Sequence, residues 1–171
     1  EIVMGVPVGF FCAVYLSKFA PPIVKNSVGF VVSLLASIPS VVYGLVAMLV
    51  LVPAVRKVFE IPDGATLLAA MIVLAIMIVP SIINVAMTAL DAVPAKYEAG
   101  SLALGATECE TYFKVSVPAA KSGIIAGVVL GVGRAIGEAM AVMMVSGNVA
   151  NMPKLFGSVR FLTTAVASEM S

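Results

Sequence analysis

The chain has 171 residues, of which 61% are hydrophobic and 11% are charged, and its formal net charge is +1. A soluble domain carries about 25% charged residues, so this composition excludes a fully hydrated surface and predicts an integral membrane protein. The absence of histidine from the sequence excludes histidine-based metal sites and histidine-based acid–base catalysis. The nearly balanced charge and the few aromatic residues give no indication of nucleic-acid binding.

Long continuous apolar runs predict transmembrane α-helices, because membrane strands would show alternating segments of about ten residues. A crossing needs about 20 apolar residues, so the length allows about four spans in an all-α, polytopic helical bundle. The predicted spans are residues 2–16, 26–55, 65–90 and 122–146; a long polar loop, 91–121, precedes the last one, and a short amphipathic helix is expected after residue 148. The first run is short and has no basic segment before it, so we expect the chain to begin inside a span of a longer protein.

The second and third predicted spans each carry a stripe of small or polar residues. The stripes are Ser33, Ser37, Ser40 and Gly44 in the second span and Met77, Ser81, Asn84 and Thr88 in the third. Pro39 and Pro80 interrupt these helices and are expected to kink them. Ordinary helix packing explains one such stripe as well as a polar path does. Because successive spans share this pattern, we favour a polar interior lined by Ser37, Ser40 and Asn84.

The fourth predicted span contains Arg134 and Glu138 near its middle. Burying one charge in hydrocarbon costs at least about 2.5 kcal/mol. Because the two residues are four positions apart, their side chains would share one face of a continuous helix and could pair. The same stripe holds Gly123, Gly127, Gly131, Ala141 and Asn148. The pair either only holds helices together or lines a route for a polar solute together with Asn148. We favour the route, because ionisable residues inside membranes are functional by default.

The long polar loop is predicted to hold two short helices. Pro94 can start the first helix, and Gly105 can end it in the left-handed conformation. Thr107 and Glu110 form the pattern of a capping box for the second helix, which Pro118 is expected to end. Two capped helices in one polar loop favour a surface that docks another protein over a solvated connector.

The loop resembles the EAA loop of binding-protein-dependent ABC importer permeases, in which a Glu-Ala-Ala group precedes a glycine and an Ile-x-Leu-Pro ending. Gly105 matches the glycine and Pro118 the final proline. Glu98 lies one position early, and Ala99, followed by Gly100, stands where the family usually has glutamate. The shift rotates the acid by about 100° on a helix, so whether Glu98 makes the usual contact stays open.

Three further strings resemble the phosphate-specific, PstC-type members of this family. They are SLLASIPSVVYGL at 33–45, VLAIMIVP at 73–80 and GVGRAIGEAMAVMMVSGN at 131–148. The closing TTAVASEM at 163–170 is also similar to these subunits. Against the six spans usual in the family, the chain would lack the first span, part of the second and the last.

The resemblance implies that residues 1–171 form a type I ABC importer permease domain that provides a path for inorganic phosphate. Loop 91–121 would be cytoplasmic, although the basic residues alone, five on its side against four on the other, only lean that way. The docking residues would be Glu98, Ala99, Gly100, Gly105 and Pro118. The chain would sit in the cytoplasmic (inner) membrane of a bacterium or archaeon.

The implied partners are a second permease subunit of PstA type, a cytoplasmic ATPase dimer of PstB type, a periplasmic phosphate-binding protein of PstS type and membrane lipid. The sequence has no G-x-x-x-x-G-K-[ST] motif, so the chain itself is not expected to bind nucleotide phosphates. As a transport subunit it is expected to be no enzyme and to hold no cofactor or metal. ATP and magnesium would be bound by the separate ATPase.

Two other functions remain open from the residues alone. An ion-coupled secondary transporter of an anion shares the intramembrane charges but is expected to show an internal repeat, which we do not find. A membrane scaffold without a transport role is the other. The Arg134 guanidinium suits an oxyanion, whereas Glu138 would repel one unless protonated phosphate donates to it or it only neutralises Arg134 until solute arrives.

Overall fold

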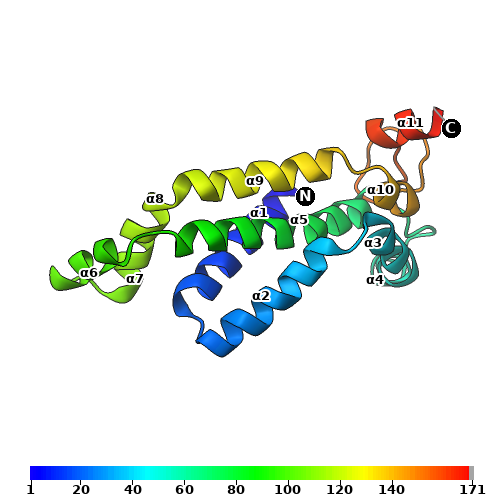
Figure 1. The fold of residues 1–171 in the computed structure, drawn as a ribbon. Coiled ribbons are helices and arrows are strands. Elements are labelled where there is room, and N and C mark those ends of the chain that lie inside the picture. The colour runs from blue at the N-terminus through cyan, green and yellow to red at the C-terminus, as the bar shows by residue number, and fades with distance from the viewer. Residues whose placement is uncertain (170–171) are drawn as a thin grey trace. The chain divides into compact units, whose positions relative to one another are not determined.

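The computed structural model describes residues 1–169, and helices make up its regular structure (Figure 1). The helices are α1 (Ile2–Val14), α2 (Pro22–Ser37), α3 (Ser40–Val46), α4 (Val52–Phe59), α5 (Leu67–Asp91), α6 (Ala95–Ala103), α7 (Glu108–Thr111), α8 (Val117–Ala119), α9 (Lys121–Ile136), α10 (Met140–Val145) and α11 (Leu162–Glu169). Three short π-helical turns, η1 (Tyr15–Phe19), η2 (Ala47–Leu51) and η3 (Tyr112–Ser116), continue α1, α3 and α7. The predicted all-α class is confirmed.

Three helical stretches are long and apolar enough to cross a membrane: Ile2–Phe19, Ser40–Phe59 and Leu67–Asp91. A fourth is present if Glu108–Ala119 and Lys121–Ile136, which meet at a bend of 69°, count as one span. The prediction of about four spans therefore holds in number. Their positions differ from the prediction in the second and fourth spans.

The predicted second span, residues 26–55, is two helices rather than one. Helix α2 ends at Ser37, and the next helix begins at Ser40. Pro39 between them has extended backbone, with φ −58° and ψ 140°. Proline lacks a backbone donor and keeps the preceding residue out of the helical region, so it ends the helix instead of kinking it. The expectation that Ser37 and Ser40 share one helical face is therefore wrong.

The third predicted span is one continuous helix, α5, of 25 residues. Its first turn is stabilised by the buried Thr66 hydroxyl, which accepts a hydrogen bond from the backbone N–H of Ala69 at 3.3 Å. The helix continues through Pro80. Neighbouring groups can compensate for the donor that a proline removes from a membrane helix, so Pro80 does not divide this span.

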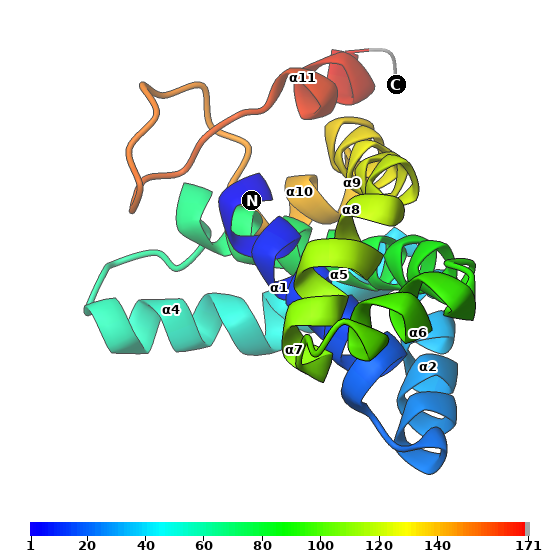
Figure 2. The same cartoon turned by 90° about the vertical axis from the view of Figure 1, so that its left-hand side faces the viewer.

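The chain forms two compact units, which we describe separately. One contains residues 3–36 and 78–132, and the other contains residues 1–2, 37–77 and 133 onward. In the first unit, the core is formed by Ala13, Val14, Leu16, Val32, Ile83, Ala86, Leu90, Ala120 and Ile124. Figure 2 shows the loop helices α6 and α7 beside each other in this unit.

Helix α9 packs closely along the second half of α5 in this first unit (Figure 1). Added Cβ atoms at the three facing glycines would lie 2.4 Å from Ala89 Cβ (Gly123), 3.1 Å from Val85 Cβ (Gly127) and 3.0 Å from Ile82 Cγ1 (Gly131). Small residues let membrane helices approach in this way. The glycine part of the predicted polar stripe therefore faces another helix.

The second unit is built around helix α3, helix α10 and the start of α5. Here too a glycine permits close approach, because a Cβ at Gly44 would lie 2.8 Å from Ala141 Cα. The segment before α11 returns to the start of α5, where the Leu67 N–H donates to the Gly157 carbonyl at 3.0 Å. The loop predicted to begin at residue 148 and the short helix predicted to follow it are confirmed. That helix is α11.

The contact between α5 and α9 predicts a specific stability effect. In Gly123→Ala the new Cβ would meet Ala89 Cβ, which is fixed to the α5 backbone, so we expect a loss of about 1–3 kcal/mol. Adding Ala89→Gly should restore most of that stability. Unfolding of the purified protein in detergent measures both effects.

Gly133→Ala is the matched control, because a Cβ at this position of the same helix meets no atom within 4 Å. Alanine also has the higher helix propensity. If Gly123→Ala is as stable as Gly133→Ala, the glycine-mediated contact does not determine how these helices pack.

Candidate solute path and docking loop

The turn between α6 and α7 has the geometry expected of a helix end that needs glycine. Gly105 has φ +88°, and its N–H donates to the Leu102 carbonyl at 3.0 Å. The N–H of Ala106 donates to the Ser101 carbonyl at 3.3 Å. A Cβ at Gly105 would meet nothing within 4 Å, so glycine is required for its backbone conformation and not for space.

The second loop helix starts with the predicted capping box. The Thr107 hydroxyl accepts from the Glu110 N–H at 3.3 Å, and the Glu110 carboxylate accepts from the Thr107 N–H at 3.2 Å. The helix runs to Ala119 and so passes the predicted end at Pro118. The π-turn η3 directly before Pro118 changes the hydrogen-bond register, which accommodates a residue without a donor.

The tip of the loop exposes apolar side chains. Leu104 is 91% exposed, and Leu102 and Tyr97 are also exposed. Four of the five predicted docking residues, Ala99, Gly100, Gly105 and Pro118, are exposed as well. The loop therefore presents a mixed surface of small and apolar groups.

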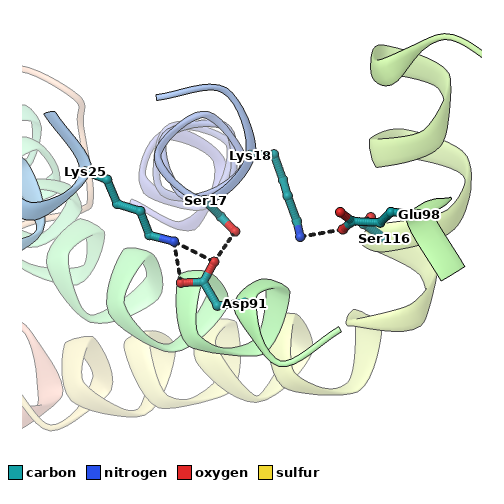
Figure 3. Close-up of polar contacts among 6 residues, drawn as sticks. All are labelled: Ser17, Lys18, Lys25, Asp91, Glu98 and Ser116. Carbon is teal, nitrogen blue, oxygen red and sulfur yellow. Dashed lines mark hydrogen bonds and ion pairs between the residues drawn. The ribbon is translucent and has the colours of Figure 1, made fainter. Parts of the chain in front are cut away.

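Glu98, the fifth predicted docking residue, is directed into its own chain (Figure 3). Its Oε1 lies 2.5 Å from Lys18 Nζ and accepts a hydrogen bond from the Ser116 hydroxyl at 2.7 Å. The Glu98 side chain is 21% exposed and that of Lys18 only 10%. Glu98 lies one residue before the position of the family glutamate, and there it contacts Lys18 and Ser116 of its own chain.

The same partners lower the pKa of the Glu98 carboxyl. Burial alone would raise this pKa, but hydrogen bonds from Lys18 and Ser116 and the charge of Lys18 outweigh burial. Because the pKa is lowered in the folded state, the stability that the pair contributes is present at neutral pH. It is lost only as the pH falls through the lowered pKa.

A second ion pair joins Lys25, near the start of α2, to Asp91 at the end of α5 (Figure 3). Lys25 Nζ lies 2.7 Å from Asp91 Oδ2, and the Ser17 hydroxyl donates to Asp91 Oδ1 at 2.6 Å. None of these residues, nor Lys18 or Ser116, is predicted from the sequence as part of a site. The sequence feature that could have indicated them is the pair of lysines on either side of Pro21-Pro22. Their partners lie more than 60 positions away in the chain, so no local pattern links the charges.

The predicted fourth span breaks between Arg134 and Glu138. Helix α9 ends at Ile136, and α10 begins at Met140. The Glu138 carboxylate accepts from the Ala141 N–H at 3.0 Å and so satisfies a donor at the start of α10. Within residues 1–169 this carboxylate forms no ion pair, so the expected pairing on one helical face is wrong.

Glu138 and Arg134 therefore have different surroundings. The Glu138 carbonyl accepts from the Thr163 hydroxyl at 3.1 Å, which ties the break to α11. Arg134 is half-buried in the last turn of α9, and its charge acts on the Tyr43 side chain of α3. Glu138 thus holds together the segments around the helix break through its carboxylate and its carbonyl.

The remaining predicted path residues divide between the two units. Asn84 lies in the first unit, where its Oδ1 is 3.5 Å from the Ser33 hydroxyl and its carbonyl accepts from Thr88 at 2.8 Å. Ser37, Ser40 and Asn148 lie in the second unit with Arg134 and Glu138. Asn148 has φ +49°, and within residues 1–169 its buried Oδ1 has no hydrogen-bond partner.

The described residues include no group of three or more cysteines, aspartates or glutamates placed to hold a metal ion. A half-buried guanidinium near a helix break can bind an anion, and the loop tip can bind another protein.

The sequence is similar to one known protein family and to several known proteins. The sequence matches the family described as binding-protein-dependent transport system inner membrane component over residues 5–166. It is 40% identical to the probable ABC transporter permease protein YqgH of Bacillus subtilis, with 98% of this chain and 54% of that protein aligned. It is 34% identical to the phosphate transport system permease protein PstC of Pasteurella multocida, over 99% of this chain and 59% of that protein.

The PstC protein of Haemophilus influenzae is 32% identical over 98% of this chain and 60% of its own length. The chain thus spans between 54% and 60% of these relatives. The family match covers nearly all of it and includes the loop, the helix break and the spans described above. The chain therefore belongs to the binding-protein-dependent transport system inner membrane component family.

Proposed function

We propose that this chain is part of the permease subunit of an ATP-driven importer and contributes to the translocation path for inorganic phosphate. The observation that carries the proposal is the capped loop α6–α7, with Gly105 at φ +88° and an exposed apolar tip, on a membrane helical chain of this family. The names of the PstC relatives support phosphate as the solute.

The loop would bind a cytoplasmic ATPase dimer of PstB type, which would bind ATP and magnesium, while the permease itself would carry out no reaction. Leu104 at the tip is 91% exposed, and an exposed apolar patch outside the spans is typical of a docking surface. A second permease subunit of PstA type and a periplasmic phosphate-binding protein of PstS type would complete the transporter in the cytoplasmic membrane.

Arg134 would bind the phosphate during transport. A guanidinium offers paired donors to an oxyanion, and Arg134 lies at the end of a membrane helix. The Glu138 carboxylate accepts from the start of α10, so the acid has a structural use that does not require contact with the solute. Ser37, Ser40, Asn84 and Asn148 stay proposed path residues.

The first prediction concerns the orientation of the chain. Cys109 should react with an impermeant thiol reagent only from the cytoplasmic side, and Lys57→Cys only from the periplasmic side. Both native cysteines are exposed, so Cys12→Ser provides the background for the first measurement, and Cys109→Ser is added for the second. Labelling of Cys109 from outside intact cells would overturn the cytoplasmic placement of the loop.

The second prediction concerns Gly105. In Gly105→Val a β-branched side chain must adopt positive φ, which costs about 1 kcal/mol or more, so ATP hydrolysis should be uncoupled from phosphate uptake. Gly105→Asn is the matched control, since asparagine tolerates this conformation. Uptake and ATPase activity of the assembled transporter measure the effect.

Cysteines introduced at Ala103 or Ala106, beside Gly105, should also cross-link to the ATPase. Cys109→Ser removes the native thiol of the loop for this experiment. Normal uptake by Gly105→Val, together with no cross-link from either cysteine, would show that the loop is not the docking surface.

The third prediction separates Arg134 from Glu138. Arg134→Gln should reduce phosphate uptake at least about tenfold while the chain still assembles with the ATPase, because the charge-assisted donors are lost. Glu138→Gln keeps an acceptor for the Ala141 N–H and should retain stability, whereas Glu138→Leu should lose about 1 kcal/mol. Uptake is measured beside membrane abundance.

Uptake at the parent rate by Arg134→Gln would exclude Arg134 as a solute-binding group. Competition by other oxyanions in the same assay tests whether phosphate is the solute. Uptake that persists without any ATPase would instead support an ion-coupled transporter.

A further inference from the structure

The ion pair between Lys18 and Glu98 is largely shielded from solvent, although Glu98 belongs to the predicted docking loop. The loop is exposed at its tip, yet the Lys18 and Glu98 side chains are only 10% and 21% exposed, and their charged atoms lie 2.5 Å apart. Figure 3 shows Lys18 reaching across to Glu98, whose Oε1 also accepts a hydrogen bond from the Ser116 hydroxyl. Glu98 is therefore held within the chain and is not presented to a partner.

The contact joins three segments that are far apart in the sequence. Lys18 lies in η1 at the end of the first span, Glu98 in α6 and Ser116 in η3. Phe19 reinforces the contact, because its ring meets the Tyr112 ring edge-on at 5.1 Å between centroids. The end of the first span is thus fixed to both helical segments of the loop.

Two of the three residues lie in π-helical turns. Such turns are rare and are frequent at functional sites, because the extra residue in the turn redirects the side chains around it. Here η1 contains Lys18 and η3 contains Ser116, and both direct their polar groups to the same carboxylate.

The pair between Lys114 and Glu110 in the same loop provides a contrast. Its charged atoms lie 3.0 Å apart, but both residues belong to one helical stretch and their side chains are 73% and 48% exposed. An exposed pair of this kind contributes little, whereas removing one member of a buried pair leaves an uncompensated charge. Of these two ion pairs, the one between Lys18 and Glu98 joins the loop to the end of a span, whereas the other stays within the loop.

We propose that Lys18, Glu98 and Ser116 form a latch that sets the orientation of α6 on the end of the first span and so couples movement of the docked loop to the membrane helices. The latch rests on the proposed function, because it assumes that the loop binds an ATPase. Its residues are positioning residues that need not contact either the ATPase or the solute.

The test compares coupling, measured as phosphate moved per ATP hydrolysed, in the reconstituted complete transporter. Glu98→Gln and Lys18→Met should each lower this ratio about tenfold, a change typical for contacting residues that act together. Both should still co-purify with the ATPase. The charge exchange of Lys18→Glu with Glu98→Lys should restore coupling above either single variant.

Lys114→Met is the matched control, since it breaks a lysine–glutamate pair of the same loop without separating two segments. It should couple as the parent does. Should Glu98→Gln fail to accumulate, Glu98→Asp keeps the charge with a shorter reach and is expected to give an intermediate ratio.

A structural measurement accompanies the coupling ratio. Spin labels at the exposed Tyr15 and Tyr97 report the distance between η1 and α6. We expect one narrow distribution in the parent and in Lys114→Met, and a broader one in Glu98→Gln.

Three results would overturn the latch. The first is an unchanged coupling ratio in Glu98→Gln or Glu98→Asp. The second is lower abundance with the parent ratio, which would make the pair only stabilising. The third is a charge exchange that couples no better than the single variants. A parent complex that binds no ATPase or moves no phosphate would instead refute the proposed function, so the two failures are distinguishable.

Discussion

The constraint on which this structure depends is that a backbone in hydrocarbon must satisfy its own hydrogen bonds. Continuous helices do this without help, as α5 does over 25 residues. Wherever a helix stops, other groups are needed. At the break after α9 the Glu138 carboxylate accepts from the start of α10, and Thr163 donates to the Glu138 carbonyl. A carboxylate is costly to place in a membrane, but the Glu138 carboxylate supplies the acceptor that the Ala141 N–H would otherwise lack at this helix break.

Close packing of helices is the second determinant, and glycine provides it in both units. Gly123 lets α9 approach Ala89 of α5, and Gly44 lets α3 approach Ala141 of α10. Lipid tails are as apolar as leucine, so association depends on such close contact more than on burial of apolar area. The same residue type has another role at Gly105, where the backbone has φ +88° and a Cβ would meet no atom of residues 1–169 within 4 Å. Glycine therefore supports packing inside the spans and conformation in the loop.

Charges gather where the spans meet the loop. Lys18 and Lys25 each bind an acid that follows the third predicted span, Glu98 and Asp91. The Lys18–Glu98 pair is the less exposed of the two, and removing one member of a pair that is largely shielded from water leaves an uncompensated charge. Glu98 of α6 is turned toward Lys18, whereas the neighbouring Ala99 and, directly after the helix, Leu104 are exposed.

The sequence by itself determined the all-α class, the number of spans, the capping box at Thr107 and the left-handed Gly105, because composition and local backbone preferences decide these. Tertiary structure decided where the helices break and which charges meet. The spacing of Arg134 and Glu138 suggests a pair only if the helix continues, and it ends between them. The partner of Lys18, Glu98, is 80 positions away in the chain, a distance over which no local pattern operates. Long-range packing, which a periodicity cannot encode, sets those contacts.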